Sequence, residues 1–147
     1  MTHADTFNLD RFVTAQGPIF EASLEELKAG RKRGHWMWFI FPQLRGLGHS
    51  SMAGFFGIGS LDEGRAYLAH SLLGPRLILV TDAVLAIEGG SLRAIFGSPD
   101  DAKFRSCMTL FSLAAGEGMC VFRRALDRYC AGCMDERTLA LLDGSAG

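Results

Sequence analysis

The residues best suited to chemistry lie close together, between positions 31 and 50 (RKRGHWMWFIFPQLRGLGHS). This stretch holds cations, an imidazole, both indoles of the chain and a carboxamide: Arg31, Lys32, Arg33, His35, Trp36, Trp38 and Gln43. Exposed loops seldom carry so many large aromatic residues, and buried helices seldom begin with Arg-Lys-Arg. We therefore expect the stretch to run from solvent into the core and to line a pocket for a small anionic, nucleotide-like ligand.

Arg31 and Lys32 are the candidates for binding the anion. A single phosphate or carboxylate responds to nearby charge rather than to the net charge of the whole protein. The same cations are also typical of a solvated helix end, where the helix dipole favours positive charge. A carboxylate of the chain is a further alternative partner of these cations: Asp62, Glu63, Asp100 or Asp101 would turn the site into an internal ion-pair network and exclude the ligand. The sequence leaves these interpretations open.

His35 and Asp101 are the candidates for acid–base catalysis. Partial burial and positive neighbours favour a neutral imidazole at His35, and a neutral imidazole can act as a general base. The alternative is a histidine that only hydrogen-bonds the backbone. For Asp101 the alternative is a role at a helix N-terminus, where the dipole attracts carboxylates.

Trp36, Trp38 and Gln43 are candidates for binding the uncharged part of the ligand. A flat ring stacked on an exposed indole gains about 1–3 kcal/mol in nucleic-acid grooves, whereas core packing is the alternative for both tryptophans. In a strand the two indoles share a face, and in a helix they do not. The Gln43 carboxamide is costly to bury without a partner, so we assign it to the site.

A second set of candidates follows the segment 98–101 (SPDD), which reads as a helix start with Ser98 as cap, a proline in the first turn and two carboxylates near the positive end. Lys103 lies in that first turn and is a candidate ligand contact. Ser106 and Thr109 fall near one flank of the same helix, where both hydroxyls can meet a polar ligand.

We expect neither a metal nor a cofactor. Cys130 and Cys133 form a CxxC, but the chain has no second pair, and this one follows a helical segment instead of opening one. The sequence also has no phosphate-binding glycine loop and no Ser-His-Asp order. In a reducing compartment all four cysteines are expected as thiols.

Composition limits the partners. The net charge of -1 makes a long nucleic acid an unsuitable partner, because affinity for nucleic acid depends on phosphate contacts. The first ten residues (MTHADTFNLD) have no apolar segment typical of a secretion signal, and no apolar run is long enough for a membrane span. We expect a cytoplasmic protein, and its oligomeric state is left open.

The elements that must position these residues are helices. Apolar residues recur at helical spacing in segments near 9–16, 19–29, 51–56, 60–70, 73–87, 92–96, 98–115, 121–129 and 135–142, while 36–41 fits a buried strand or a helical turn. Expected caps are Asn8, Ser50 or Ser51, and Ser60 with Glu63 as a capping box. We predict an all-α or mainly α single domain over 1–147, a compact bundle of about six to eight helices with at most a minor strand and loose ends near 1–6 and 144–147.

The segment HWMWFIFPQLRGLGHS (35–50) resembles the signature of the bacterial domain-of-unknown-function family eighteen-ten, whose members often carry the label calpastatin. The resemblance continues through 12–16 (FVTAQ), 60–70 (SLDEGRAYLAH), 73–77 (LGPRL), 96–111 (FGSPDDAKFRSCMTLF) and 135–139. It implies a small, mainly helical protein. Gly34, Phe56 and Cys107 depart from the serine, tyrosine and serine expected in the family.

Shorter pieces are similar to the NADAR family, which acts on N-glycosidic bonds linked to ADP-ribose. They are Phe12 with Ala15 and Gln16, the segment 103–108 followed by Phe111, and the tryptophans followed by Gly-Leu-Gly. The pieces stand in a different order, so the likeness requires a circular permutation. It implies a metal-independent hydrolase in which the basic run holds a pyrophosphate, an indole stacks on a base, and His35 or a carboxylate assists cleavage.

Two classes of function follow from these observations. One is a hydrolase for a nucleotide or ADP-ribose-like substrate, and the other is a non-catalytic module whose aromatic cleft binds a ligand or a protein. Convergence of Lys32, His35, Gln43 and a carboxylate on one concave site favours catalysis, and their dispersal favours the module.

Overall fold

The computed structural model describes residues 5–116 and 120–144, and this part of the chain is helical without a β-strand. Ten helices follow one another: α1 (Asp10–Gln16), α2 (Phe20–Lys28), α3 (Met37–Ile40), α4 (Ser51–Phe56), α5 (Leu61–Ala69), α6 (Leu73–Leu85), α7 (Leu92–Phe96), α8 (Asp100–Ala115), α9 (Val121–Tyr129) and α10 (Glu136–Gly144). The predicted helical class is confirmed, but the expected count of helices is too low. The excess comes from the short helices α3, α4 and α7, which have 4, 6 and 5 residues.

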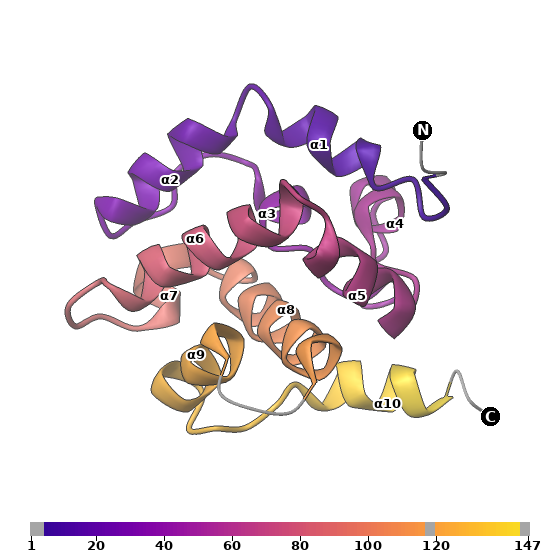
Figure 1. Ribbon diagram of the computed structural model, residues 1–147. Coiled ribbons are helices and arrows are strands. Elements are labelled where there is room, and N and C mark those ends of the chain that lie inside the picture. The colour runs from indigo at the N-terminus through magenta and orange to yellow at the C-terminus, as the bar shows by residue number, and fades with distance from the viewer. Residues whose placement is uncertain (1–4, 117–119, 145–147) are drawn as a thin grey trace.

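Helix α8 runs through the middle of the molecule and packs against α5, α7 and α9, while α6 packs against α2, α5 and α9 (Figure 1). Aromatic side chains fill much of the space between these helices; those that are almost wholly buried are Trp36, Tyr67, Phe12, Phe41, Phe104 and Phe111. The Phe41 ring meets the rings of Phe96 and Phe104 at centroid distances of 5.7 and 5.1 Å. The stretch after α2 is therefore anchored in the core through Phe41.

The first helix begins differently from the prediction. Asn8 is not its cap: the carboxylate of Asp5 accepts hydrogen bonds from the amides of Leu9 and Asp10 at 2.7 and 2.9 Å. Asn8 instead adopts a φ of 53°, which turns the chain so that Asp5 reaches those amides. Asp5 is thus ordered, contrary to the expected loose end, whereas residues 1–4 and 145–147 lie outside the described part.

Helix α5 begins at the predicted capping box, with one change. The Ser60 hydroxyl accepts from the Glu63 amide at 3.1 Å, but Glu63 reaches back to the amide of Gly59 at 2.8 Å instead of that of Ser60. Its other carboxylate oxygen is held by Arg11 at 2.7 Å. Glu63 therefore joins α5 to α1 as well as capping its own helix.

Arg11 and Glu63 form a buried ion pair, which we call the scaffold pair; each side chain is only 5% exposed. The Arg11 guanidinium also donates to four backbone carbonyls, at distances from 2.7 to 3.0 Å, those of Phe7, Asn8, Phe55 and Gly57. These hydrogen bonds satisfy the N–H donors of the guanidinium, which burial removes from water. The scaffold pair thus ties α4 and α5 to the N-terminal helix.

The start of α8 also differs from the prediction. Ser98 makes no capping hydrogen bond, and Pro99 takes the cap position, with no side chain capping the helix. Asp100 and Asp101 do occupy the first turn, as expected from the helix dipole. Because Ser98 is not the cap, the two carboxylates carry the electrostatic stabilisation of this helix end.

The segment 36–41 forms the short helix α3, and it is largely buried, as predicted. Only Trp38 is half-buried there. Gln16, itself 1% exposed, donates to the carbonyl of Phe39 at 2.7 Å and to the Tyr67 hydroxyl at 3.1 Å. This amide fixes α3 against α1 and α5.

After α3 the chain turns at Gly46, whose φ of 103° suits glycine, and Ser50 then caps α4 by accepting from the Ala53 amide at 3.1 Å. A single parallel bridge joins Leu44 and Ile58 on the two sides of this turn. The turn brings α4 back against α3, and the two short helices form one wall of the site.

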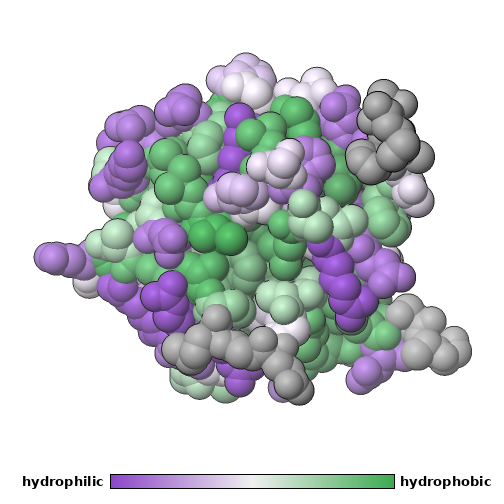
Figure 2. All heavy atoms as spheres, viewed as in Figure 1, coloured by the Kyte–Doolittle hydropathy of each residue, from purple (hydrophilic) through white to green (hydrophobic). Residues whose placement is uncertain are grey.

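Helix α6 carries two exposed apolar side chains, Ile78 and Leu79, at 44% and 47% exposure. Figure 2 shows hydrophobic residues gathered across the middle of this face, over α6.

Within the described residues no single helix has both the length and the apolar character to cross a membrane. The helices α5 and α6 taken together are long and apolar enough, by length and composition alone, but they are bent by 89° to each other.

Candidate functional site

A hollow opens between α3, α4, the loop after α3 and the first turn of α8, and we call it the Trp38 pocket. Its lining residues are Met37, Trp38, Phe41, Gln43, Ala53, Phe56, Gly57 and Lys103. Its cavity volume is about 10 Å³, roughly the space that one water molecule needs. It is therefore a narrow site with apolar walls that admits one small group.

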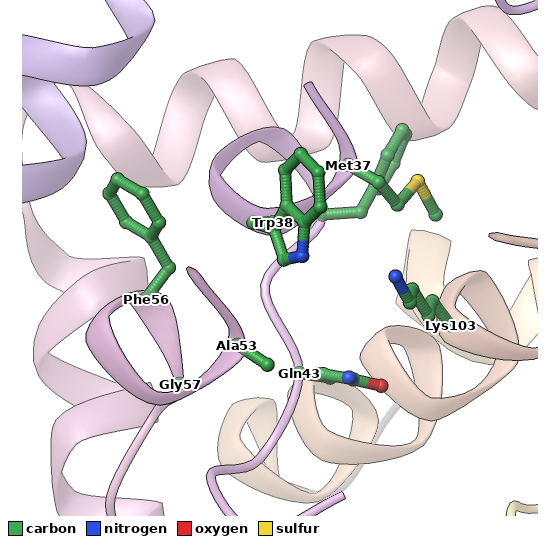
Figure 3. A pocket seen from close by; sticks show the side chains of 8 residues that line it. Met37, Trp38, Gln43, Ala53, Phe56, Gly57 and Lys103 are labelled. Carbon is green, nitrogen blue, oxygen red and sulfur yellow. The ribbon is translucent and has the colours of Figure 1, made fainter. Parts of the chain in front are cut away.

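Three polar side chains meet in the Trp38 pocket. Figure 3 shows the ammonium group of Lys103 directed toward the Trp38 indole, with the Gln43 side chain lying below them in this view. Neither the Trp38 indole nor the Gln43 carboxamide makes a hydrogen bond with any residue in the described part of the chain. The Lys103 ammonium lies 5.2 Å from the Trp38 ring centroid, in cation–π geometry.

Lys103 also belongs to a charged group that we call the site cluster, formed by Lys32, Asp100 and Lys103. Lys32 Nζ lies 2.9 Å from Asp100 Oδ2, and Lys103 Nζ lies 3.6 Å from Asp100 Oδ1. Lys32 Nζ also donates to the Gly34 carbonyl at 2.5 Å and lies 5.1 Å from the Trp36 ring centroid. One carboxylate thus faces two ammonium groups.

Glu26 organises the chain just before α3. Its Oε1 accepts hydrogen bonds from the amides of Arg33 and Gly34 and from the indole of Trp36, at 2.7, 2.8 and 3.0 Å. Burial raises the pKa of Glu26, but these hydrogen bonds, with Lys32 nearby, outweigh burial and lower the pKa overall. One oxygen of this carboxylate is thereby engaged by three donors of the same segment.

The structure brings some of the predicted site residues together and separates others. Trp38, Gln43 and Lys103 share one pocket. Trp36 is 2% exposed, and its indole N–H is taken by Glu26, so it belongs to the core and leaves no ring face open to a ligand. His35 is exposed and lines neither the Trp38 pocket nor the other described hollows, which differs from the partly buried base that we expected.

The remaining candidates are engaged by their own helix. Asp101 accepts from the Ala102 amide at 2.8 Å and meets no lysine. The Ser106 hydroxyl donates to the Ala102 carbonyl at 3.1 Å, and that of Thr109 donates to the Arg105 carbonyl at 2.9 Å. Buried helical hydroxyls commonly bond the carbonyl four residues earlier. Thr109 also accepts a hydrogen bond from the Asp135 amide at 2.8 Å, and neither residue lines the Trp38 pocket.

The sequence interpretation missed the α4 wall. Asp100 was expected at the helix start and as one possible ion-pair partner of the basic run, and it does pair with Lys32 and Lys103, so this part of the site is an internal ion-pair network. The i,i+3 spacing of Asp100 and Lys103 was the available signal, because residues so spaced are neighbours on a helix. Ala53, Phe56 and Gly57 close the pocket from a distant segment, and no local pattern marks them.

The cysteines and metal ligands add no chemistry to this site. The described residues include no group of three or more side chains able to hold a metal ion. Cys107 is buried, and burial raises the pKa of its thiol well above the ordinary value, which makes it unreactive. The geometry favours binding of a group that accepts hydrogen bonds and carries negative charge.

Comparison with known proteins agrees with this picture of a small helical protein built around α6 and α8. The family described as proteins of unknown function (DUF1810) matches residues 6–142. The chain therefore belongs to the DUF1810 family, as its resemblance indicated.

A solved structure of a relative has the same fold. It is the crystal structure of the conserved hypothetical protein Rv1873 from Mycobacterium tuberculosis, with 54% sequence identity and a TM-score of 0.90 over 95% of this chain and 99% of that chain. No curated protein matches the chain.

Proposed function

We propose that the Trp38 pocket binds the anionic end of a small, nucleotide-like ligand and that the protein acts as a binding module. The observation that carries this proposal is the meeting of Trp38, Gln43 and Lys103 in one hollow. Polar groups that converge in an apolar pocket typically fix the orientation of a ligand. The free thiols of the chain are consistent with a reducing cytoplasm as the place of action.

The size of the pocket supports insertion of a single group. Complete ligand sites usually enclose about 300–1,000 Å³. The cavity volume of about 10 Å³ is far too small for a whole nucleotide. One carboxylate or phosphoryl oxygen fits among the indole N–H, the carboxamide and the ammonium group, while the rest of the ligand lies outside.

Binding without catalysis is favoured by the placement of the acid–base candidates. A general base must lie within hydrogen-bond reach of the proton that it removes. His35 does not line the pocket, Asp101 is bonded to its own helix, and both oxygens of Asp100 are engaged by lysines. The hydrolase hypothesis is therefore the second outcome of the test and not the conclusion.

The test is a thermal-shift screen of ADP-ribose, NAD and mononucleotides against the native chain and the variants Lys103→Met and Gln43→Ala. A ligand at one hundred times its Kd adds about 2.7 kcal/mol of stability, or about 5–10 °C in Tm for a protein of this size. The control is Lys28→Met, because Lys28 is an exposed lysine at the end of α2, 59% exposed, that meets only Glu25 at 3.9 Å.

We expect a ligand that shifts the native chain and Lys28→Met equally and shifts the two pocket variants much less. A shift that survives both pocket substitutions would move the site elsewhere and overturn the proposal. Chromatography of the same mixtures after incubation tests the non-catalytic part, because cleavage of the N-glycosidic bond by the native chain would establish a hydrolase.

A further inference from the structure

A second hollow, which we call the arginine cleft, lies between the chain leaving α2 and the helix α7. Its lining consists of Arg31, Lys32, Arg93, Ala94, Ile95, Phe96 and Gly97. It measures about 390 Å³, and most of its exposed lining is polar. This volume falls within the range of small-molecule sites, in contrast to the narrow Trp38 pocket.

The backbone holds the two walls of the cleft together. Gly30, with a φ of 87°, ends α2 and sends the chain toward α7. The Lys32 amide then donates to the Ile95 carbonyl at 2.8 Å, which fixes the loop against α7. Ile95 and Phe96 line the bottom of the cleft and are buried in the core. The backbone that carries Arg31 and Arg93 is therefore held by core packing.

The carboxylates nearest in sequence and structure are already committed to other partners. Glu26 accepts three hydrogen bonds from the chain at 33–36, and Asp100 pairs with Lys32 and Lys103. The Lys32 ammonium is turned to Asp100 and is 8% exposed, so it contributes little to the cleft directly.

Arg31 and Arg93 are both exposed, and neither makes an ion pair or side-chain hydrogen bond within the described part of the chain. Glu88 is the acidic residue closest before Arg93 in the sequence, and it does not line the cleft. Two exposed arginines with no ion pair in the described part of the chain thus line one polar hollow in a protein whose net charge is -1.

We propose that the arginine cleft binds the phosphate group of a small phosphorylated molecule through Arg31 and Arg93. A guanidinium presents its N–H donors as a planar fork that matches phosphate oxygens, and such charge-assisted bonds are about twice as strong as neutral ones. Two forks on opposite walls suit a dianionic phosphate better than a single carboxylate. The site involves none of the side chains that carry the function proposed for the Trp38 pocket, so either can stand without the other.

The experiment is isothermal titration of the native chain with glycerol phosphate and with inorganic phosphate at constant ionic strength, with acetate as the carboxylate comparison. Arg31→Gln and Arg93→Gln remove one fork each. Arg33→Gln is the matched control, because Arg33 is an exposed arginine of the same loop that does not line the cleft. Circular dichroism checks that each variant is folded.

We expect phosphate binding that acetate does not reproduce, an affinity about tenfold lower in each single cleft variant, and no change in Arg33→Gln. Phosphate binding that weakens equally in all three arginine variants would reveal a diffuse charge effect and overturn the proposal. So would an absence of measurable phosphate binding, or binding lost in Lys103→Met but kept in both cleft variants, which would assign the phosphate to the Trp38 pocket.

Discussion

The scaffold pair (Arg11 and Glu63) and the site cluster (Lys32, Asp100 and Lys103) both combine a carboxylate with basic side chains, but they differ in how completely their charges are satisfied. Arg11 makes five hydrogen bonds, as many as a guanidinium has N–H groups, and both oxygens of Glu63 are used. In the site cluster Asp100 is shared by two ammonium groups, and Lys103 remains 25% exposed beside a hollow.

This difference separates structural charges from charges available to a ligand. A buried charge with all its partners inside the protein has nothing left to offer, and its loss affects stability alone. A charge in excess, placed at the edge of a pocket, is stabilised further when an anion arrives. The two groups of residues should therefore respond to mutation in different ways.

The largest effect is expected for Glu63→Ala, which leaves the Arg11 charge buried without its partner. Breaking a buried pair in this way costs about 3–5 kcal/mol of unfolding free energy, measured by urea denaturation. Asp62→Ala is the control, because Asp62 is the adjacent residue, 80% exposed, and meets only Arg65 at 3.0 Å. Asp62→Ala should lower the unfolding free energy by about 1 kcal/mol or less. A similarly small loss for Glu63→Ala would contradict the distinction between structural charges and charges available to a ligand.

A smaller loss of stability, with a gain of binding, is expected for Asp100→Asn. Removing a charged hydrogen-bond partner from Lys32 should cost about 1.5–3 kcal/mol. The same change frees Lys103 from its counter-charge, so affinity for an anion in the Trp38 pocket should rise. Titration calorimetry with the ligand found by the screen measures this gain.

Asp101→Asn is the matched control for Asp100→Asn. Both residues lie in the first turn of α8, so the two variants lose the same interaction with the helix dipole. Asp101 meets no lysine, and its variant should leave anion affinity unchanged. If affinity falls in Asp100→Asn, then Asp100 itself binds the ligand and the site cluster is not a source of free positive charge.

Much of the fold could be predicted because it depends on local chemistry. The spacing of apolar residues placed the long helices, and Ser50 and Ser60 cap α4 and α5 as expected. The failures at Asn8 and Ser98 have one cause. At α1 the carboxylate of Asp5 binds the first amides in place of Asn8. At α8 the carboxylates of the first turn stand where Ser98 was expected to cap. Such competition between neighbouring residues is not visible from one position of the sequence.

The candidate site could be predicted in part. Trp38, Gln43 and Lys103 come from two segments 60 residues apart, and all three line one pocket, whereas His35 does not join them. Which of Asp100 and Asp101 faces the lysines depends on the rotation of α8, and that rotation is set by the packing of Phe104 and its neighbours in the core. Arg93 was missed because nothing in its own segment indicates a cleft.

A change of about 1 kcal/mol or less in unfolding free energy is expected for Trp38→Phe, which keeps an aromatic ring beneath Lys103 while removing the indole N–H and part of the ring system. Ligand affinity should nevertheless fall about tenfold, because one hydrogen-bond donor is lost. Trp36→Phe is the contrasting variant, since its indole N–H serves Glu26. It should reduce stability and leave affinity unchanged, and the reverse pattern would exchange the roles of the two tryptophans.

The smallest effect is expected for Glu26. The pH dependence of its contribution to the unfolding free energy decides whether Glu26 resembles the scaffold pair or the site cluster. Burial raises its pKa, but hydrogen bonds from the amides of Gly34 and Arg33 and from the Trp36 indole lower it overall. A carboxylate whose folded-state pKa is lowered stabilises the protein fully above its unfolded pKa of about 4.3, and loses that contribution as the pH falls through the folded-state value. The gap in unfolding free energy between the native chain and Glu26→Gln should therefore be widest near pH 7 and narrow on acidification, as measured by urea denaturation from pH 7 to pH 3.

Glu25→Gln controls for position in α2, because Glu25 is exposed and should contribute little to the unfolding free energy at pH 7. A gap that stays constant or widens in acid would mean that the folded protein does not favour the Glu26 carboxylate, and Glu26 would then no longer count among the satisfied charges that leave Arg31 free to bind an anion.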